Sequence, residues 1–123
     1  MPTRTITLSD RPPVEIDEEK WPLVARSQYE LEFDRRPYRT WRLHVRQHAD
    51  GRSLVYGTYR LNGEFSERGE DDRKAARVLL DAGADIVGAI RETAEDIAGR
   101  ADDPVARDLI RECLAQMPAD RLD

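Results

Sequence analysis

The side chains best suited to binding a charged ligand cluster between residues 35 and 52. This stretch holds six arginines and one acid, Asp50, so its net charge is +5 in a chain whose net charge is −5. Guanidinium groups pair with phosphate and carboxylate oxygens, and Tyr38 and Tyr59 could stack on bases. The cluster indicates a surface for RNA, DNA or an acidic protein. Its candidate binding residues are Arg35, Arg36, Arg39, Arg42, His44, Arg46, His48 and Arg52.

The same cluster also has a purely structural interpretation. Glu30 and Glu32 lie on one face of the preceding predicted strand, where they could pair with arginines of the next strand. Such cross-strand ion pairs stabilise a sheet by roughly 0.2–1 kcal/mol each. We expect this structural role to prevail, with ligand binding as the alternative.

Other residue types offer little chemistry. His44 and His48 are four residues apart, which is about 13 Å along a strand, whereas both ligands of one ion lie about 2 Å from it. Cys113 falls on the apolar stripe of a predicted helix, which favours a buried thiol over a nucleophile. The chain has no Gly-rich phosphate loop, nucleophile elbow or His-Glu-x-x-His helix. We therefore expect no metal, no cofactor and no catalytic residue.

The elements that must position these residues begin with strands. Polar and apolar residues alternate with period 2 in three segments, which predicts strands over 23–33, 40–48 and 53–61. Ala49-Asp50-Gly51 predicts the turn between the second and third strands, and the hairpin signal Asn62-Gly63 leaves room for a short fourth strand near 64–66.

The N-terminal segment is ambiguous. Residues 1–13 combine a short alternating run with prolines, which predicts either an edge strand or a loose arm. Asp17 is placed to cap a single helical turn, and Trp21, Trp41 and Tyr56 are expected in the core.

The second half of the chain has helical periodicity. A helix is predicted over 75–82, ended by Gly83, and another from Asp85 to Gly99, although one continuous helix would also fit. Asp103 and Pro104 open the last helix, which runs to Met117 before Pro118. The pattern predicts an α+β fold: a three- or four-stranded antiparallel sheet, a β-meander, followed by about three C-terminal helices packed on one face.

Length and composition limit the number of domains, the cell compartment and the kinds of partner. The 123 residues suit a single domain spanning residues 1–123. One cysteine favours a reducing compartment, and no apolar run is long enough for a signal peptide or membrane span, so we expect a cytoplasmic protein with no membrane partner. Residues 61–123 carry 9 basic and 16 acidic groups, which disfavours general binding to phosphate backbones.

Three short runs resemble a known group of sequences. Residues 45–52 read Val-Arg-Gln-His-Ala-Asp-Gly-Arg, residues 55–57 read Val-Tyr-Gly, and residues 85–91 read Asp-Ile-Val-Gly-Ala-Ile-Arg. Together they are similar to a signature of small uncharacterised bacterial proteins carried on plasmids and integrating elements. The resemblance implies a host-interaction or accessory role in mobile DNA, and it brings no activity or catalytic residue with it.

We therefore expect a small non-enzymatic binding protein whose partner is another protein, with self-association included. A basic and an acidic surface on one small body suit protein contacts, because opposite charges steer an encounter. Two alternatives stay open: nucleic-acid binding through the Arg-rich hairpin face, and an enzyme whose site assembles only in three dimensions.

Overall fold

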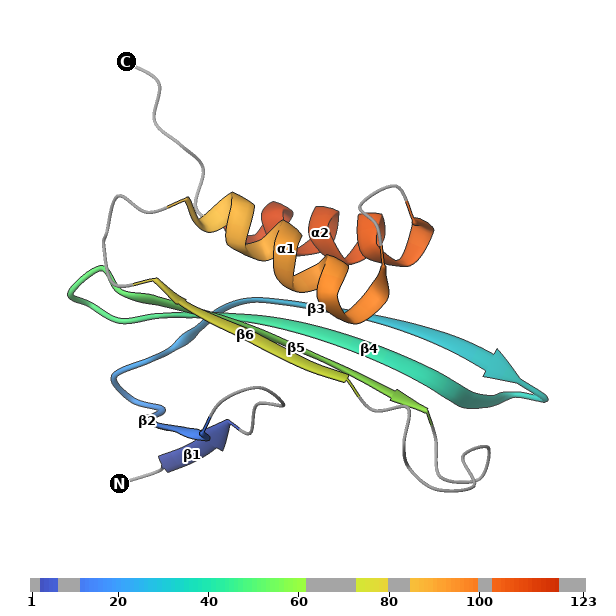
Figure 1. The fold of residues 1–123 in the computed structure, drawn as a ribbon, viewed down its shortest axis with the longest axis horizontal. Helices are drawn as coiled ribbons and strands as arrows, with labels where there is room; N and C mark the ends of the chain where they lie inside the picture. Colours follow the sequence, from blue (N-terminus) through green and yellow to red (C-terminus); the bar gives the residue numbers. More distant parts are fainter. Residues whose placement is uncertain (1–2, 7–11, 62–72, 80–84, 100–102, 118–123) are drawn as a thin grey trace, which may run out of the picture.

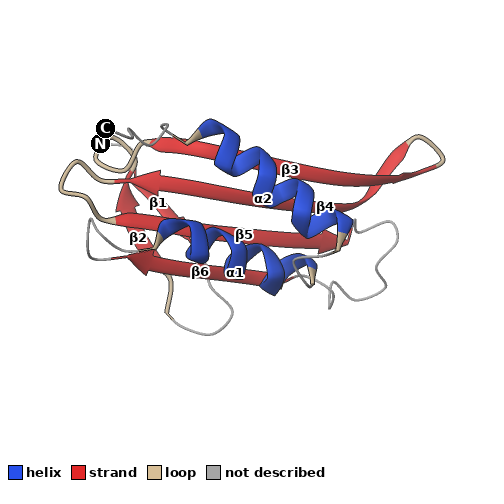
Figure 2. Ribbon diagram, turned by 90° about the horizontal axis from the view of Figure 1, so that it is seen from above, coloured by secondary structure: helices blue, strands red, loops and turns tan. Residues whose placement is uncertain are grey.

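The fold is built around an antiparallel sheet in which each strand pairs with the next along the chain. The computed structural model describes residues 3–6, 12–61, 73–79, 85–99 and 103–117. The sheet consists of β3 (Leu23–Phe33), β4 (Arg36–Gln47), β5 (Ser53–Leu61) and β6 (Arg73–Leu79), in that order. Helices α1 (Ile86–Ala98) and α2 (Pro104–Gln116) lie side by side on one face of it (Figures 1 and 2). The α+β class and the predicted three- or four-stranded antiparallel meander are thus confirmed, with β6 as its fourth strand in place of the one expected near 64–66.

Short turns set the register of two hairpins. Asp34 and Arg35 join β3 to β4 with φ values of 52° and 64°, the left-handed conformation typical of a two-residue hairpin loop. The predicted turn before β5 is also confirmed. There Gly51 has φ 98°, and the Asp50 carboxylate accepts a hydrogen bond from the backbone N–H of Arg52 at 3.0 Å.

Alternation along β4 divides its side chains between the two faces of the sheet. Trp41, Leu43 and Val45 face the helices and are buried. The interpretation of Cys113 as a core residue is confirmed, because it is fully buried on α2. The main core also contains Ala25, Val55, Tyr59, Ala89, Ile90, Ala94, Ile97, Leu109 and Ile110.

Both helices begin at the predicted capping residues. The Asp85 carboxylate accepts a hydrogen bond from the N–H of Gly88 at 2.9 Å, and α1 ends at Gly99, whose φ is 98°. The Asp103 carboxylate accepts a hydrogen bond from the N–H of Val105 at 2.9 Å, with Pro104 at the first helical position. These caps satisfy backbone donors that a helix leaves unpaired at its start.

The helix predicted over 75–82 is wrong where the structure describes the chain, because residues 73–79 form strand β6. Alanine favours a helix in isolation, but here Ala75 and Ala76 pack on opposite faces of the sheet. Pairing with the backbone of β5 outweighs the local preference. Two helices rather than three therefore follow the meander in the described part. The short strand expected near 64–66 and the end of the predicted helix at 80–82 lie outside the described residues.

An N-terminal hairpin covers part of the sheet face opposite the helices (Figure 1). It is formed by β1 (Thr3–Ile6) and β2 (Val14–Asp17), which pair antiparallel as a second, two-stranded sheet. Its side chains build a second core with β5 and β6, made of Ile6, Ile16, Leu54, Tyr56 and Ala76. The expectation of a single sheet is therefore wrong. Of the two alternatives for residues 1–13, a strand or a loose arm, the strand is present at Thr3–Ile6. Sequence reasoning missed β2 because its four residues are too few to show a period.

Candidate binding surfaces

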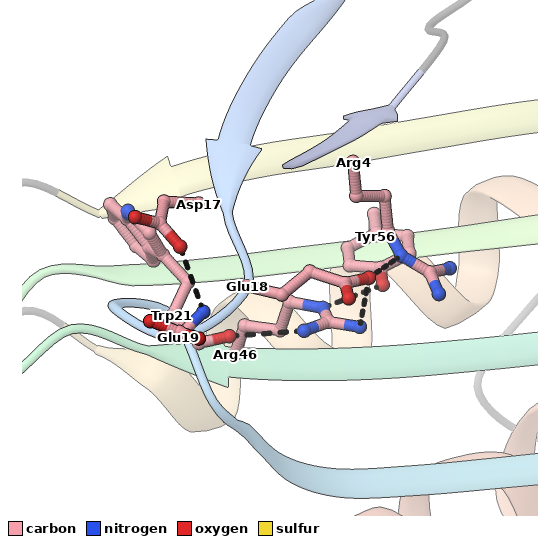
Figure 3. Close-up of polar contacts among 7 residues, drawn as sticks. All are labelled: Arg4, Asp17, Glu18, Glu19, Trp21, Arg46 and Tyr56. Atoms are coloured by element: carbon pink, nitrogen blue, oxygen red, sulfur yellow. Dashed lines mark hydrogen bonds and ion pairs between the residues drawn. The ribbon is translucent and has the colours of Figure 1, made fainter. Parts of the chain in front are cut away.

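Arg46 is the most enclosed member of the predicted basic cluster, with 7% of its surface exposed. It points away from the helices, under the turn that leads from the N-terminal hairpin into β3 (Figure 3). Its Nε donates a hydrogen bond to the Tyr56 hydroxyl at 3.0 Å, and its Nη1 donates one to the Trp21 carbonyl at 3.0 Å. A guanidinium that forms two hydrogen bonds within the protein has a structural role, and little of its surface is accessible to a ligand.

The charge of Arg46 is balanced from the hairpin side. An oxygen of Glu18 lies 3.9 Å from its Nη2, and the same carboxylate pairs with Arg4 of β1. The hydrogen bond from Arg4 lowers the pKa of Glu18 and raises that of Arg4. The predicted turn after Asp17 is present here, since the Asp17 carboxylate accepts a hydrogen bond from the N–H of Glu19 at 3.0 Å. Together these groups fasten the N-terminal hairpin to β4.

His44, two residues before Arg46 on the same face, carries no positive charge at neutral pH. Its ring stacks on Tyr56 with centroids 4.8 Å apart and an interplanar angle of 13°. Burial is the main reason why its pKa falls to about 4, and the neighbouring Arg46 and Arg26 lower it further. Its Nδ1 is buried without a hydrogen-bond partner. His44 is therefore a neutral packing residue in this structure.

His48 and Arg52 are held by their own turn. The Nδ1 of His48 accepts a hydrogen bond from the N–H of Asp50 at 3.1 Å, and the Arg52 Nε donates to the Asp50 carboxylate at 2.7 Å. The backbone and side-chain hydrogen bonds from Arg52 lower the pKa of Asp50. Trp21 closes the group, with the Arg52 guanidinium 5.0 Å above its ring and the His48 ring 5.1 Å away.

The remaining arginines of the cluster point in different directions. Arg42 is exposed on the face opposite the helices and donates a hydrogen bond to the Gln28 side chain at 3.1 Å. Arg35 and Arg36 lie at the β3–β4 turn. Arg39 shares the helix-side face with Trp41, because odd-numbered residues of β4 face that way. The eight predicted site residues therefore do not form one surface. Across the β3–β4 pair Arg42 contacts Gln28, and the pairing of the cluster with Glu30 and Glu32 stays a prediction.

A small cleft of about 290 Å³ lies beside Arg39, where the helix layer ends over the sheet. Asp103 reaches into it, but one oxygen of this carboxylate already caps α2. The aromatic rings of Trp41 and Tyr59 are more than nine-tenths buried beneath it, so they present little surface to a ligand. The residues that line this cleft therefore do not combine a nucleophile and a general base with an accessible binding surface.

A larger groove, of about 440 Å³, runs along the outer surface between α1 and α2. Its floor is apolar, formed by Ile110 and the half-buried Leu114 of α2. Three exposed arginines line it: Arg91 from α1, and Arg107 and Arg111 from α2. We refer to these five residues as the helical groove.

Two of the three arginines in the helical groove have unused hydrogen-bonding capacity. Arg111 donates to the Asp108 carboxylate at 2.9 Å, whereas neither Arg91 nor Arg107 forms a hydrogen bond or ion pair among the described residues. Sequence reasoning missed this site because the acidic residues of the same half mask it in the net charge. The usable signal was the spacing of Arg107 and Arg111, one turn apart beside Leu114.

The described residues contain no group of three or more His, Cys, Asp or Glu side chains that could hold a metal ion. None of the helices in the described segments is long and apolar enough to cross a membrane. No protein-family model, curated protein or solved structure matches the chain.

Proposed function

We propose that this chain is a small non-enzymatic binding protein that contacts another protein through the helical groove. The observation that carries the proposal is the combination of an apolar floor with the unpaired guanidiniums of Arg91 and Arg107. Arginine is enriched at protein interfaces, where its weakly hydrated guanidinium contacts apolar and acidic groups together. Ile110 is only 8% exposed, so the accessible apolar surface comes from the half-buried Leu114; such a surface beside exposed guanidinium groups suits a protein contact.

The sheet face supports nucleic-acid binding less well. Of its predicted basic residues, Arg46 is buried, His44 is neutral, and His48 and Arg52 are engaged with Asp50 and Trp21. A backbone-binding surface needs several guanidinium or ammonium groups free to reach successive phosphates. Of the predicted residues on this part of the face only Arg42 stays exposed, where it contacts Gln28; the exposed Arg26 and Arg60 lie outside the predicted cluster.

The similarity of residues 45–52 and 85–91 to proteins carried on plasmids and integrating elements supports a narrower form of the proposal. In that form the chain is an accessory factor of mobile DNA, and its partner is a protein of the host cell. Arg91 belongs both to the similar run at residues 85–91 and to the helical groove.

The test is affinity capture of the tagged chain from the cell that encodes it, at low salt and after nuclease treatment. Three forms are compared: wild type, the groove variant R91E/R107E, and the control R26E/R42E, which makes the same charge change at two exposed arginines of the sheet. The proposal predicts a discrete protein that survives nuclease, is lost with the groove variant and is retained by the control. Material that is nuclease-sensitive and lost only with R26E/R42E would instead assign the function to nucleic-acid binding.

A further inference from the structure

The shape of the helical groove indicates what kind of segment it can accept. Both helices that form it satisfy their own backbone groups, so the groove offers side chains only. An extended segment would bring unpaired backbone N–H and C=O groups onto the apolar floor, which is costly. A helix has no such cost, because its backbone is paired internally.

The spacing of the groove residues also matches a helix. Ile110 and Leu114 are one turn apart on α2, as are Arg107 and Arg111. The floor is therefore a row of two apolar positions beside a parallel row of two cations. A helix lying along the groove presents an apolar stripe at i, i+3, i+4 and i+7 to such a floor, and packs at an interaxial distance of about 8–10 Å.

The charges fix which residues must flank that stripe. Arg91 lies on α1 at one side of the groove, and Arg107 and Arg111 lie on α2 at the other. A ligand helix with carboxylates on both sides of its apolar stripe would pair with Arg91 on one side and with Arg107 on the other, since Arg111 already pairs with Asp108, and lysines at these positions would be repelled. Resting on the proposed function, we infer that the helical groove binds an acidic amphipathic helix of the partner protein.

The dimensions of the site limit this contact to a modest one. On α2 the groove is lined from Arg107 to Leu114, which is about 10 Å at 1.5 Å per residue, so a ligand helix makes contact over about two turns. Ion pairs at this exposed site are screened by salt. Binding is therefore expected to be reversible and to weaken as ionic strength rises.

The experiment uses a defined probe: a fluorescein-labelled peptide of about 16 residues with a leucine stripe and glutamates on both sides. Its binding to the full chain is measured by fluorescence anisotropy in about 50 mM and about 300 mM salt. Two control peptides are a scrambled sequence of the same composition and a version with lysine in place of glutamate. R91E/R107E is compared with R26E/R42E, with circular dichroism to verify that both fold.

The inference predicts saturable binding of the acidic helix that weakens about tenfold or more in R91E/R107E, since two attractions become repulsions, and changes less than about twofold in R26E/R42E. It also predicts that the lysine peptide binds R91E/R107E better than it binds wild type. Equal binding of the acidic and scrambled peptides, or indifference to the groove variant, would overturn it.

Two further outcomes separate this inference from the proposed function. Capture of a protein that depends on Arg91 and Arg107, together with no binding of the acidic helix, would leave the proposed function standing and overturn the helical partner. Sedimentation of the chain alone tests self-association. A concentration-dependent dimer that is lost in R91E/R107E would assign the groove to a second copy, and the inference would fall.

Discussion

Protonation of His44 is expected to weaken the fold as pH falls below neutrality. The folded chain holds this imidazole neutral, with a pKa of about 4 against an ordinary value of 6.5. The unfolded chain binds the proton more readily, so acid favours unfolding. The contribution of His44 to stability is complete above pH 6.5 and is lost as pH falls from 6.5 towards about 4.

The size of this effect follows from the shift. A difference of about 2.5 pH units at 1.36 kcal/mol each sets an upper limit near 3 kcal/mol. His44 is only partly buried, and solvent screening at its exposed edge reduces the effect to about 2 kcal/mol.

The variant His44→Phe isolates the titration. Phenylalanine can keep the ring stacked on Tyr56, cannot be protonated, and removes the unpaired buried Nδ1. At pH 7.5 we therefore expect the variant to be as stable as wild type or more so. Urea unfolding between pH 7.5 and 4.5 gives the free energy of unfolding of both chains.

The expected result is a difference between the two chains that widens by about 2 kcal/mol towards low pH, with the variant the more stable. Carboxylates such as Glu18 titrate in both chains, so their effect cancels in the comparison. A difference constant to within about 0.5 kcal/mol over this range would refute a neutral, desolvated His44. The two histidines of the chain can also be titrated individually by NMR.

Three further substitutions test how the fold is held. Arg46→Ala leaves the buried Tyr56 hydroxyl and the Trp21 carbonyl without their donor, so it should lower the free energy of unfolding by about 2–4 kcal/mol and speed amide exchange in the N-terminal hairpin. Arg42→Ala should cost less than about 0.5 kcal/mol, and equal costs for the two variants would contradict a structural role of Arg46. Gln116→Ala removes the side-chain amide that both accepts from and donates to the backbone of Arg26 on edge strand β3. The Arg26 amide should then exchange faster, and the free energy of unfolding should fall by about 1–2 kcal/mol. An unchanged exchange rate would contradict protection of the Arg26 amide by Gln116. Gly57→Ala places a Cβ 2.8 Å from the Ile97 side chain of α1 and 3.2 Å from the Arg42 carbonyl oxygen, so it should cost about 1–3 kcal/mol in urea unfolding. A cost below about 0.5 kcal/mol would contradict this close packing.

Much of the fold was predictable because its signals are local. Alternation defined β3, β4 and β5, and the capping residues Asp85 and Asp103 located both helices. Strand β6 was not predictable in this way, since its alanines favour a helix until β5 supplies a partner. The pairing of β1 with β2, and the docking of both on β5, depend on contacts distant in sequence that no local period reveals.

In the candidate site, too, local patterns were predictable and contacts between distant segments were not. Alternation correctly separated Arg42 and Arg46 from the helix-side core, and the same rule would have excluded Arg39, which shares the face of Trp41. It could not show that the N-terminal hairpin and its following turn enclose Arg46. The helical groove was hidden because it is made by two helices, each of which carries as many acids as arginines or more.

Photo-crosslinking in the cell shows whether a partner protein binds at the helical groove. A photoreactive residue is placed at Val87, one turn from Arg91 on α1, or at Leu23 at the start of β3; both native side chains are 42% exposed. We expect a protein crosslink from position 87, through an acidic helical segment of the partner, that disappears when R91E/R107E is added. Crosslinks from position 23 alone, or to nucleic acid, would contradict it.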